Sequence, residues 1–130
     1  GHSSPKHKPP YFSPKKFRIP MLWLGGALNK NIKEINTIAS QVDFPYTLLD
    51  LLKADNKDFI FSKNIFNTSD EQFAHYTFNK GFGTLTKNGL FLYDYTSEKP
   101  ILETGKNTTK LDSLGKAITQ NSYSDFLKRK

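Results

Sequence analysis

The sequence contains no cysteine among its 130 residues. This absence excludes disulfide bonds, thiol nucleophiles and cysteine-ligated zinc. There is also no run of about 18 consecutive apolar residues, so we expect no membrane-spanning segment in this chain. Methionine and tryptophan occur once each, and histidine three times. Aromatic residues nevertheless make up 14% of the chain, and 11 of them are phenylalanine, which is enough apolar volume to build a folded core.

The excess positive charge lies at the two ends of the chain. Lys and Arg number 19 against 12 Asp and Glu, which gives a formal charge of +7. Five of the cations fall in residues 1–18, which hold no acid, and three more are residues 128–130. A nucleic-acid groove would interleave basic and aromatic residues along one element, so this pattern disfavours nucleic acid as a partner. A stand-alone module that binds anions or nucleic acid through its basic ends is the alternative function.

The first part of the chain changes character at residue 17. Residues 1–16 contain four prolines and little periodicity, which predicts an extended basic loop. Residues 17–24 are almost continuously apolar and end at a glycine pair, so we expect a buried strand covered on both faces. Residues 32–39 place an apolar side chain about every third position, and either a helical turn or an irregular extended arm fits that spacing.

A helix is predicted to begin at Asp43 and to end near Lys53. The Asp43 carboxylate suits an N-cap, and Pro45 falls in the first turn, where a missing N–H has no cost. The apolar residues share one face at spacings of four, seven and eight, and they are Phe44, Leu48, Leu51 and Leu52.

The second half of the chain predicts an antiparallel meander and then a helix. Residues 73–78, 82–86 and 90–95 have strand character, and Asn88-Gly89 is a hairpin signal. The remainder, residues 101–130, is predicted to be a helical tail. Thr109 with Asp112 resembles a capping box at the start of this helix. An apolar stripe follows at Leu111, Leu114 and Ile118, and a break is expected around Asn121-Ser122.

The three histidines are the main candidates for chemistry. His2 and His7 lie in the basic loop, where imidazole and lysine together suit a metal or anion site. From their spacing alone, a solvated or vector-derived segment is the favoured explanation. His75 falls on an alternating strand and is interpreted as a structural side chain. No complete set of catalytic residues is visible, so the predicted catalytic set is empty.

Two stretches of the sequence resemble the C-terminal part of sulfatase-like enzymes. The nearest branch is the lipoteichoic acid synthase and phosphoglycerol transferase family, in the alkaline phosphatase superfamily. The resemblance covers roughly residues 17–95 and is carried by Arg18-Ile19-Pro20-Met21-Leu22-Trp23-Leu24-Gly25-Gly26, by Ser40-Gln41-Val42-Asp43-Phe44-Pro45-Tyr46-Thr47-Leu48-Leu49-Asp50-Leu51-Leu52 and by Phe61-Ser62-Lys63-Asn64-Ile65. Phe82-Gly83 and Leu92-Tyr93-Asp94 resemble the closing antiparallel sheet of that family. The helix proline, Pro45, stands one place earlier than in the family pattern.

The resemblance implies an α/β fold, or α+β for this chain in isolation. Residues 17–100 would form a piece of an alkaline phosphatase-like core with a small C-terminal antiparallel sheet, preceded by the basic loop of residues 1–16 and followed by the tail of residues 101–130. The rest of the catalytic domain is the implied partner. We also expect self-association through the core face that this partner would cover.

The resemblance further implies a metal-dependent parent enzyme that hydrolyses or transfers phosphate or sulfate esters. Its divalent metal (Mn, Zn, Mg or Ca) and its Thr or Ser nucleophile would belong to the larger domain, so we expect this chain alone to be inactive and to hold no cofactor. The family has an Asp-His-Gly ligand motif. Gly1 is either the glycine of that motif or a tag remnant. His2 is the metal-ligand candidate, and the candidates for binding the anionic ester are Lys6, His7 and Lys8. The parent would act on the extracytoplasmic side of a bacterial inner membrane.

Overall fold

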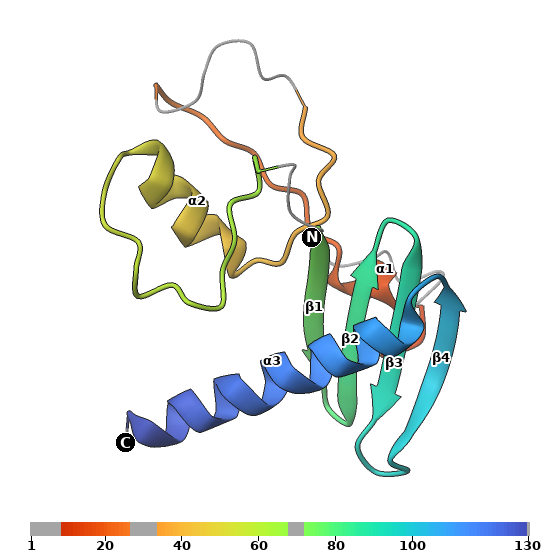
Figure 1. Ribbon diagram of the computed structural model, residues 1–130. Coiled ribbons are helices and arrows are strands. Elements are labelled where there is room, and N and C mark those ends of the chain that lie inside the picture. The colour runs from red at the N-terminus through yellow and green to blue at the C-terminus, as the bar shows by residue number, and fades with distance from the viewer. Residues whose placement is uncertain (1–8, 27–33, 68–71, 130) are drawn as a thin grey trace.

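Four strands joined in chain order form an antiparallel sheet, and helices flank it (Figure 1). This arrangement is seen in a computed structural model that describes residues 9–26, 34–67 and 72–129. The elements are α1 (Pro14–Phe17), α2 (Asp43–Leu51), β1 (Phe73–Phe78), β2 (Gly81–Thr86), β3 (Gly89–Asp94), β4 (Lys99–Gly105) and α3 (Thr108–Lys128). The chain therefore has a mixed α+β fold. Within the described ranges, no helix combines the length and the apolar character needed to cross a bilayer.

The predicted meander is confirmed, with one strand more than expected. β1, β2 and β3 match the predicted strands to within a residue or two, and Asn88 lies in the β2–β3 connection. β4 falls at the start of the segment that was predicted to be a helical tail, and it pairs with β3. It was missed because it is an edge strand that is exposed at every residue except Ile101, so it has no apolar alternation. Pro100 also removes one backbone donor, which is tolerated only at an edge.

One face of the sheet is covered by α3. Leu111 is buried against Phe82 and Phe91, and the predicted apolar stripe of this helix is confirmed. Gly115 allows this close packing, because a Cβ atom there would lie 2.1 Å from the Phe82 ring. The predicted capping box is wrong: the N-cap is Asn107, and no side chain caps the helix. The predicted break is also wrong, since α3 continues without interruption to Lys128.

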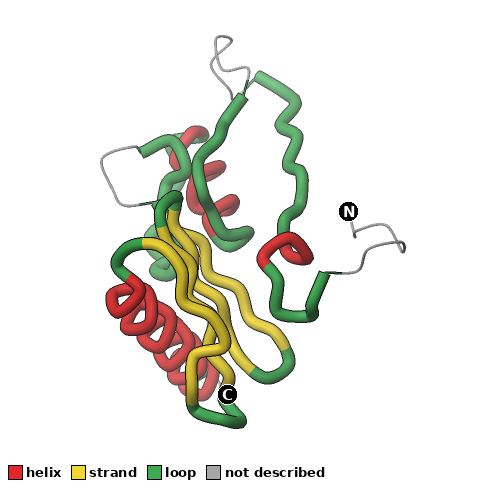
Figure 2. The backbone as a smooth tube through the Cα atoms, turned by 90° about the vertical axis from the view of Figure 1, so that its right-hand side faces the viewer, coloured by secondary structure: helices red, strands yellow, loops and turns green. Residues whose placement is uncertain are grey.

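The other face of the sheet carries the N-terminal segment (Figure 2). The Phe17 ring stacks on Tyr76 with the ring centroids 4.3 Å apart. The Tyr76 hydroxyl donates a hydrogen bond of 2.8 Å to the backbone carbonyl of Phe12. Opposite Tyr76 stands Gly83, where a Cβ atom would lie 2.3 Å from the tyrosine ring. The prediction of an extended loop up to residue 16 is therefore partly wrong, because α1 forms one helical turn against this face.

The predicted buried strand at residues 17–24 is not present. Past α1 the segment is extended without strand pairing, and the Leu22 and Leu24 side chains are 82% and 86% exposed. Only Trp23 turns inward, with its ring 5.0 Å from that of Phe44 in α2. An apolar run forms a buried strand only when neighbouring strands and helices cover it, and the described residues provide no such cover on this side. Residues 34–40 contain no helical turn, so of the two alternatives the irregular arm fits these residues, while residues 32 and 33 lie outside the described part of the chain.

α2 begins at Asp43, as predicted, but Asp43 is not its N-cap. The N-cap is Val42, and the Asp43 carboxylate points away from the first turn. The predicted apolar face is also only partly buried, since Leu52 is exposed while Thr47, on another face of the helix, is fully buried. Local spacing predicted the helix correctly, and long-range polar contacts determine which residues it buries.

Candidate functional site

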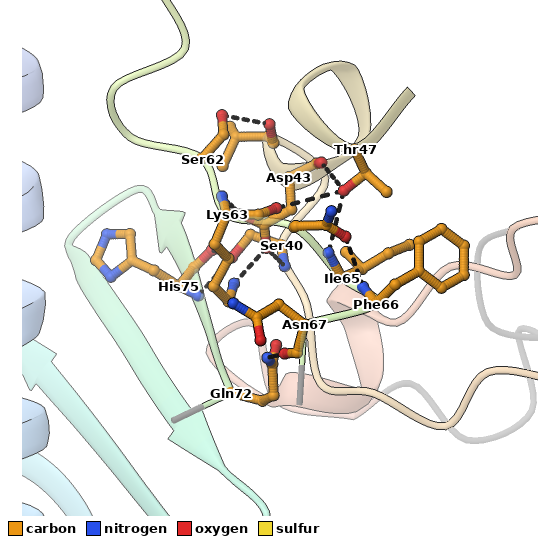
Figure 3. Close-up of polar contacts among 12 residues, drawn as sticks. Ser40, Asp43, Thr47, Ser62, Lys63, Ile65, Phe66, Asn67, Gln72 and His75 are labelled. Atoms are coloured by element: carbon orange, nitrogen blue, oxygen red, sulfur yellow. Dashed lines mark hydrogen bonds and ion pairs between the residues drawn. The ribbon is translucent and has the colours of Figure 1, made fainter. Parts of the chain in front are cut away.

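A buried ion pair lies at the beginning of α2 (Figure 3). The Asp43 side chain is 2% exposed, and its Oδ2 atom is paired with Nζ of Lys63. The same carboxylate accepts hydrogen bonds from the backbone N–H of Ser40 at 2.7 Å and from that of Lys63 at 3.0 Å. The Lys63 ammonium also lies 4.4 Å from the centre of the Phe73 ring. Each charge is therefore compensated inside the protein, as a buried pair requires.

Thr47 extends this polar network along α2. Its hydroxyl donates to the backbone carbonyl of Asp43 at 2.7 Å and accepts from the backbone N–H of Ile65 at 3.1 Å. Next to it, the Ser62 hydroxyl donates to the carbonyl of Val42 at 2.7 Å. These contacts hold residues 62–65 against the helix, so two segments about 20 residues apart in sequence form one unit.

Ser40 connects this unit to the edge of the sheet. Its hydroxyl accepts a hydrogen bond from the backbone N–H of His75 at 2.8 Å and donates one to the carbonyl of His75 at 3.2 Å. A serine side chain thus occupies the backbone groups that β1 would otherwise offer to a neighbouring strand at this point. Ser40 and Asp43 have the spacing of a capping box, and the Ser40 N–H donates to the Asp43 carboxylate as in that motif, although the N-cap of α2 is Val42 and the Ser40 hydroxyl bonds His75 instead.

His75 lies on the face of β1 that α3 covers. Its Nδ1 atom is 3.3 Å from Oγ1 of Thr84, and its Nε2 atom is 3.4 Å from Oγ1 of Thr119. Burial lowers the pKa of His75 to about 4, so the ring is neutral near pH 7. The Thr119 hydroxyl already donates to the carbonyl of Gly115, so a neutral ring protonated on Nε2 satisfies both contacts. Thr84 is fully buried, whereas His75 and Thr119 are half-buried.

The chemistry of these groups is that of a structural network. Both oxygens of Asp43 are engaged, and neither Asp43 nor Thr47 is accessible to a ligand. Among the described residues, no three His, Cys, Asp or Glu side chains come close enough to hold a metal ion. The sequence did not indicate that Lys63 is the partner of Asp43, since nothing local relates residues 20 positions apart. The Ser40–Asp43 spacing was the available signal.

The predicted site residues fall outside this network. His2, Lys6, His7 and Lys8 all lie outside the described residues. His75, which was interpreted as structural, is half-buried between its two threonine partners on β2 and α3. In comparisons with known proteins, no protein family, no curated protein and no solved structure matches this chain.

Proposed function

We propose that this chain is the C-terminal part of a metal-dependent sulfatase-like enzyme of the lipoteichoic acid synthase and phosphoglycerol transferase type. The parent would hydrolyse or transfer phosphate or sulfate esters on the extracytoplasmic side of a bacterial inner membrane. In this proposal, Met21–Leu24 and Asp43–Leu52 belong to an edge of an alkaline phosphatase-like core, and the small sheet of β1–β4 closes that core. We expect this chain by itself to be inactive, because the nucleophile and most metal ligands of the parent would lie in the rest of the catalytic domain.

The observation that carries the proposal is the exposure of the segment between Ile19 and Leu24. Its sequence is among the most apolar in the chain, yet Leu22 and Leu24 are more than four-fifths exposed. Trp23 anchors the segment on α2 between the rings of Phe44 and Phe66. An extended, apolar and anchored segment of this kind is suited to pair with strands of a larger domain.

The basic loop supplies the substrate-facing part of the proposal. Lys6 and Lys8, with Lys15 on α1, would attract the anionic head of the ester. His7 would contact the substrate, and His2 would complete the ligand set of a divalent metal (Mn, Zn, Mg or Ca) held mainly by the catalytic domain. Such a metal would supply positive charge for the developing negative charge on the ester oxygens.

The experiment compares this chain with a longer protein from the same reading frame. We expect the codons before His2 to encode an Asp-His-Gly motif preceded by a hydrolase domain. The longer protein should release 4-nitrophenol from phosphodiester or sulfate esters when manganese or zinc is added. In that protein, His7→Ala should lower turnover and Lys57→Ala, at an exposed ion pair, should not. Metal-stimulated turnover by the 130-residue chain alone, or an unrelated upstream sequence, would overturn the proposal.

A further inference from the structure

The C-terminal turns of α3 extend beyond the sheet that the rest of the helix covers. Figure 1 shows α3 crossing the strands and continuing past β1 toward the C-terminus. Thr119 contacts His75 of β1, whereas Tyr123, Phe126 and Leu127 are 63%, 55% and 49% exposed. Residues three and four positions apart lie on the same side of a helix, so these three large side chains form one apolar stripe.

Positive charge adjoins this stripe. Lys128 and Arg129 follow it directly on the helix, both exposed, and the sequence continues with Lys130. The acid in these last turns is Asp125, whose carboxylate pairs with Nε of Arg129 at 2.8 Å. A groove beside the same turns is lined by Ile60, Phe61 and the helix residues Asn121, Ser124, Asp125 and Lys128. The end of α3 therefore combines exposed aromatic and aliphatic side chains with a net positive charge.

From this combination we infer that the end of α3 docks on an anionic lipid surface. Helices that lie in a membrane interface insert aromatic and leucine side chains at the acyl boundary while Lys and Arg contact anionic headgroups. A protein partner with an acidic rim, or a nucleic acid, would engage the same cations, but a nucleic acid would not use the aliphatic Leu127 and Ile60. This surface is separate from the Ile19–Leu24 segment, so it is testable independently of the proposed catalytic role.

The test measures sedimentation of the full 130-residue chain with lipid vesicles. We expect binding to phosphatidylcholine vesicles that contain phosphatidylglycerol, weaker binding at high salt, and little binding to phosphatidylcholine alone. Phe126→Ser with Leu127→Ser, and separately Lys128→Glu with Arg129→Glu, should each weaken binding by about tenfold or more. Tyr123→Ser alone should give a smaller loss, and circular dichroism should show that all variants keep the helix.

Two matched variants make the result specific. Lys80→Glu with Lys87→Glu reverses two exposed cations in the turns of the sheet, and it should leave most of the binding intact. Leu22→Ser with Leu24→Ser removes the other exposed apolar segment and should also leave it intact. Loss of binding in either of these variants, but not in the α3 variants, would overturn the inference. So would equal binding to both kinds of vesicle, or binding of a labelled oligonucleotide through Lys128 and Arg129 while vesicles are ignored.

Discussion

His75 shows how a single buried side chain makes stability depend on pH. Burial holds the pKa of His75 at about 4 in the folded chain, against 6.5 for an unperturbed imidazole. Between these two pH values the unfolded chain binds a proton that the folded chain does not bind. The free energy of unfolding therefore falls as the pH is lowered from 6.5 toward 4, and the stabilisation is fully present only above 6.5.

We expect this effect to be removed in the variant His75→Gln, whose side chain can still contact Thr84 and Thr119. Between pH 7 and pH 4.5, the wild-type chain should lose roughly 2 kcal/mol more stability than the variant, allowing for the partly exposed ring. Urea unfolding of both proteins at the two pH values measures the difference, and carboxylates that titrate in the same range contribute equally to both. Parallel pH profiles would show that the ring is solvated in the folded state.

At the scale of elements, α2 and the segment of residues 62–65 are joined by the buried pair of Asp43 and Lys63. We expect Asp43→Asn to destabilise the chain by about 3 kcal/mol, because it leaves the Lys63 ammonium without a counter-ion in a site where its side chain is 15% exposed. Urea unfolding monitored by Trp23 fluorescence measures the loss, since this indole packs on α2. The matched control is Asp55→Asn at the exposed pair with Lys57, which should change stability by less than about 0.5 kcal/mol. Equal effects of the two substitutions would contradict the structural role of the pair.

The elements also show which parts of the fold could be predicted from sequence. β1, β2, β3, α2 and α3 carry strong local signals, namely alternation, an Asn-Gly turn and helical stripes, and all five were predicted. β4 has no such signal, because an edge strand needs no buried face. The partners of Asp43 were missed for a different reason. Local spacing predicted that its carboxylate caps its own helix, whereas in the structure it accepts hydrogen bonds from Lys63, which lies 20 residues away.

At the scale of the whole molecule, the composition of residues 17–24 predicted a buried strand, but the structure has no buried strand there. Composition indicates that Leu22 and Leu24 favour burial, whereas burial itself depends on what lies opposite them. In this chain the Leu22 and Leu24 side chains face solvent. Trp23 packs on Phe44 of α2, and the polar network connects α2 to the sheet. The candidate site also depends on residues that are far apart in sequence. A ligand set needs groups from several elements, and a local motif identifies only those within one element.

The uncovered leucines should make the isolated chain self-associate. We expect light scattering after size-exclusion chromatography to show a mass that rises with concentration, because two copies can bury Leu22 and Leu24 against each other. Leu22→Ser with Leu24→Ser should keep the chain monomeric at the same concentrations. Because both side chains are more than four-fifths exposed, this variant should change the free energy of unfolding of the monomer by no more than about 0.5 kcal/mol. Lys15→Ser with Lys16→Ser is the matched control and should associate like the wild type. A loss of several kcal/mol in the leucine variant would instead mean that this segment is buried in the chain's own core, and the need for a covering domain would disappear with it.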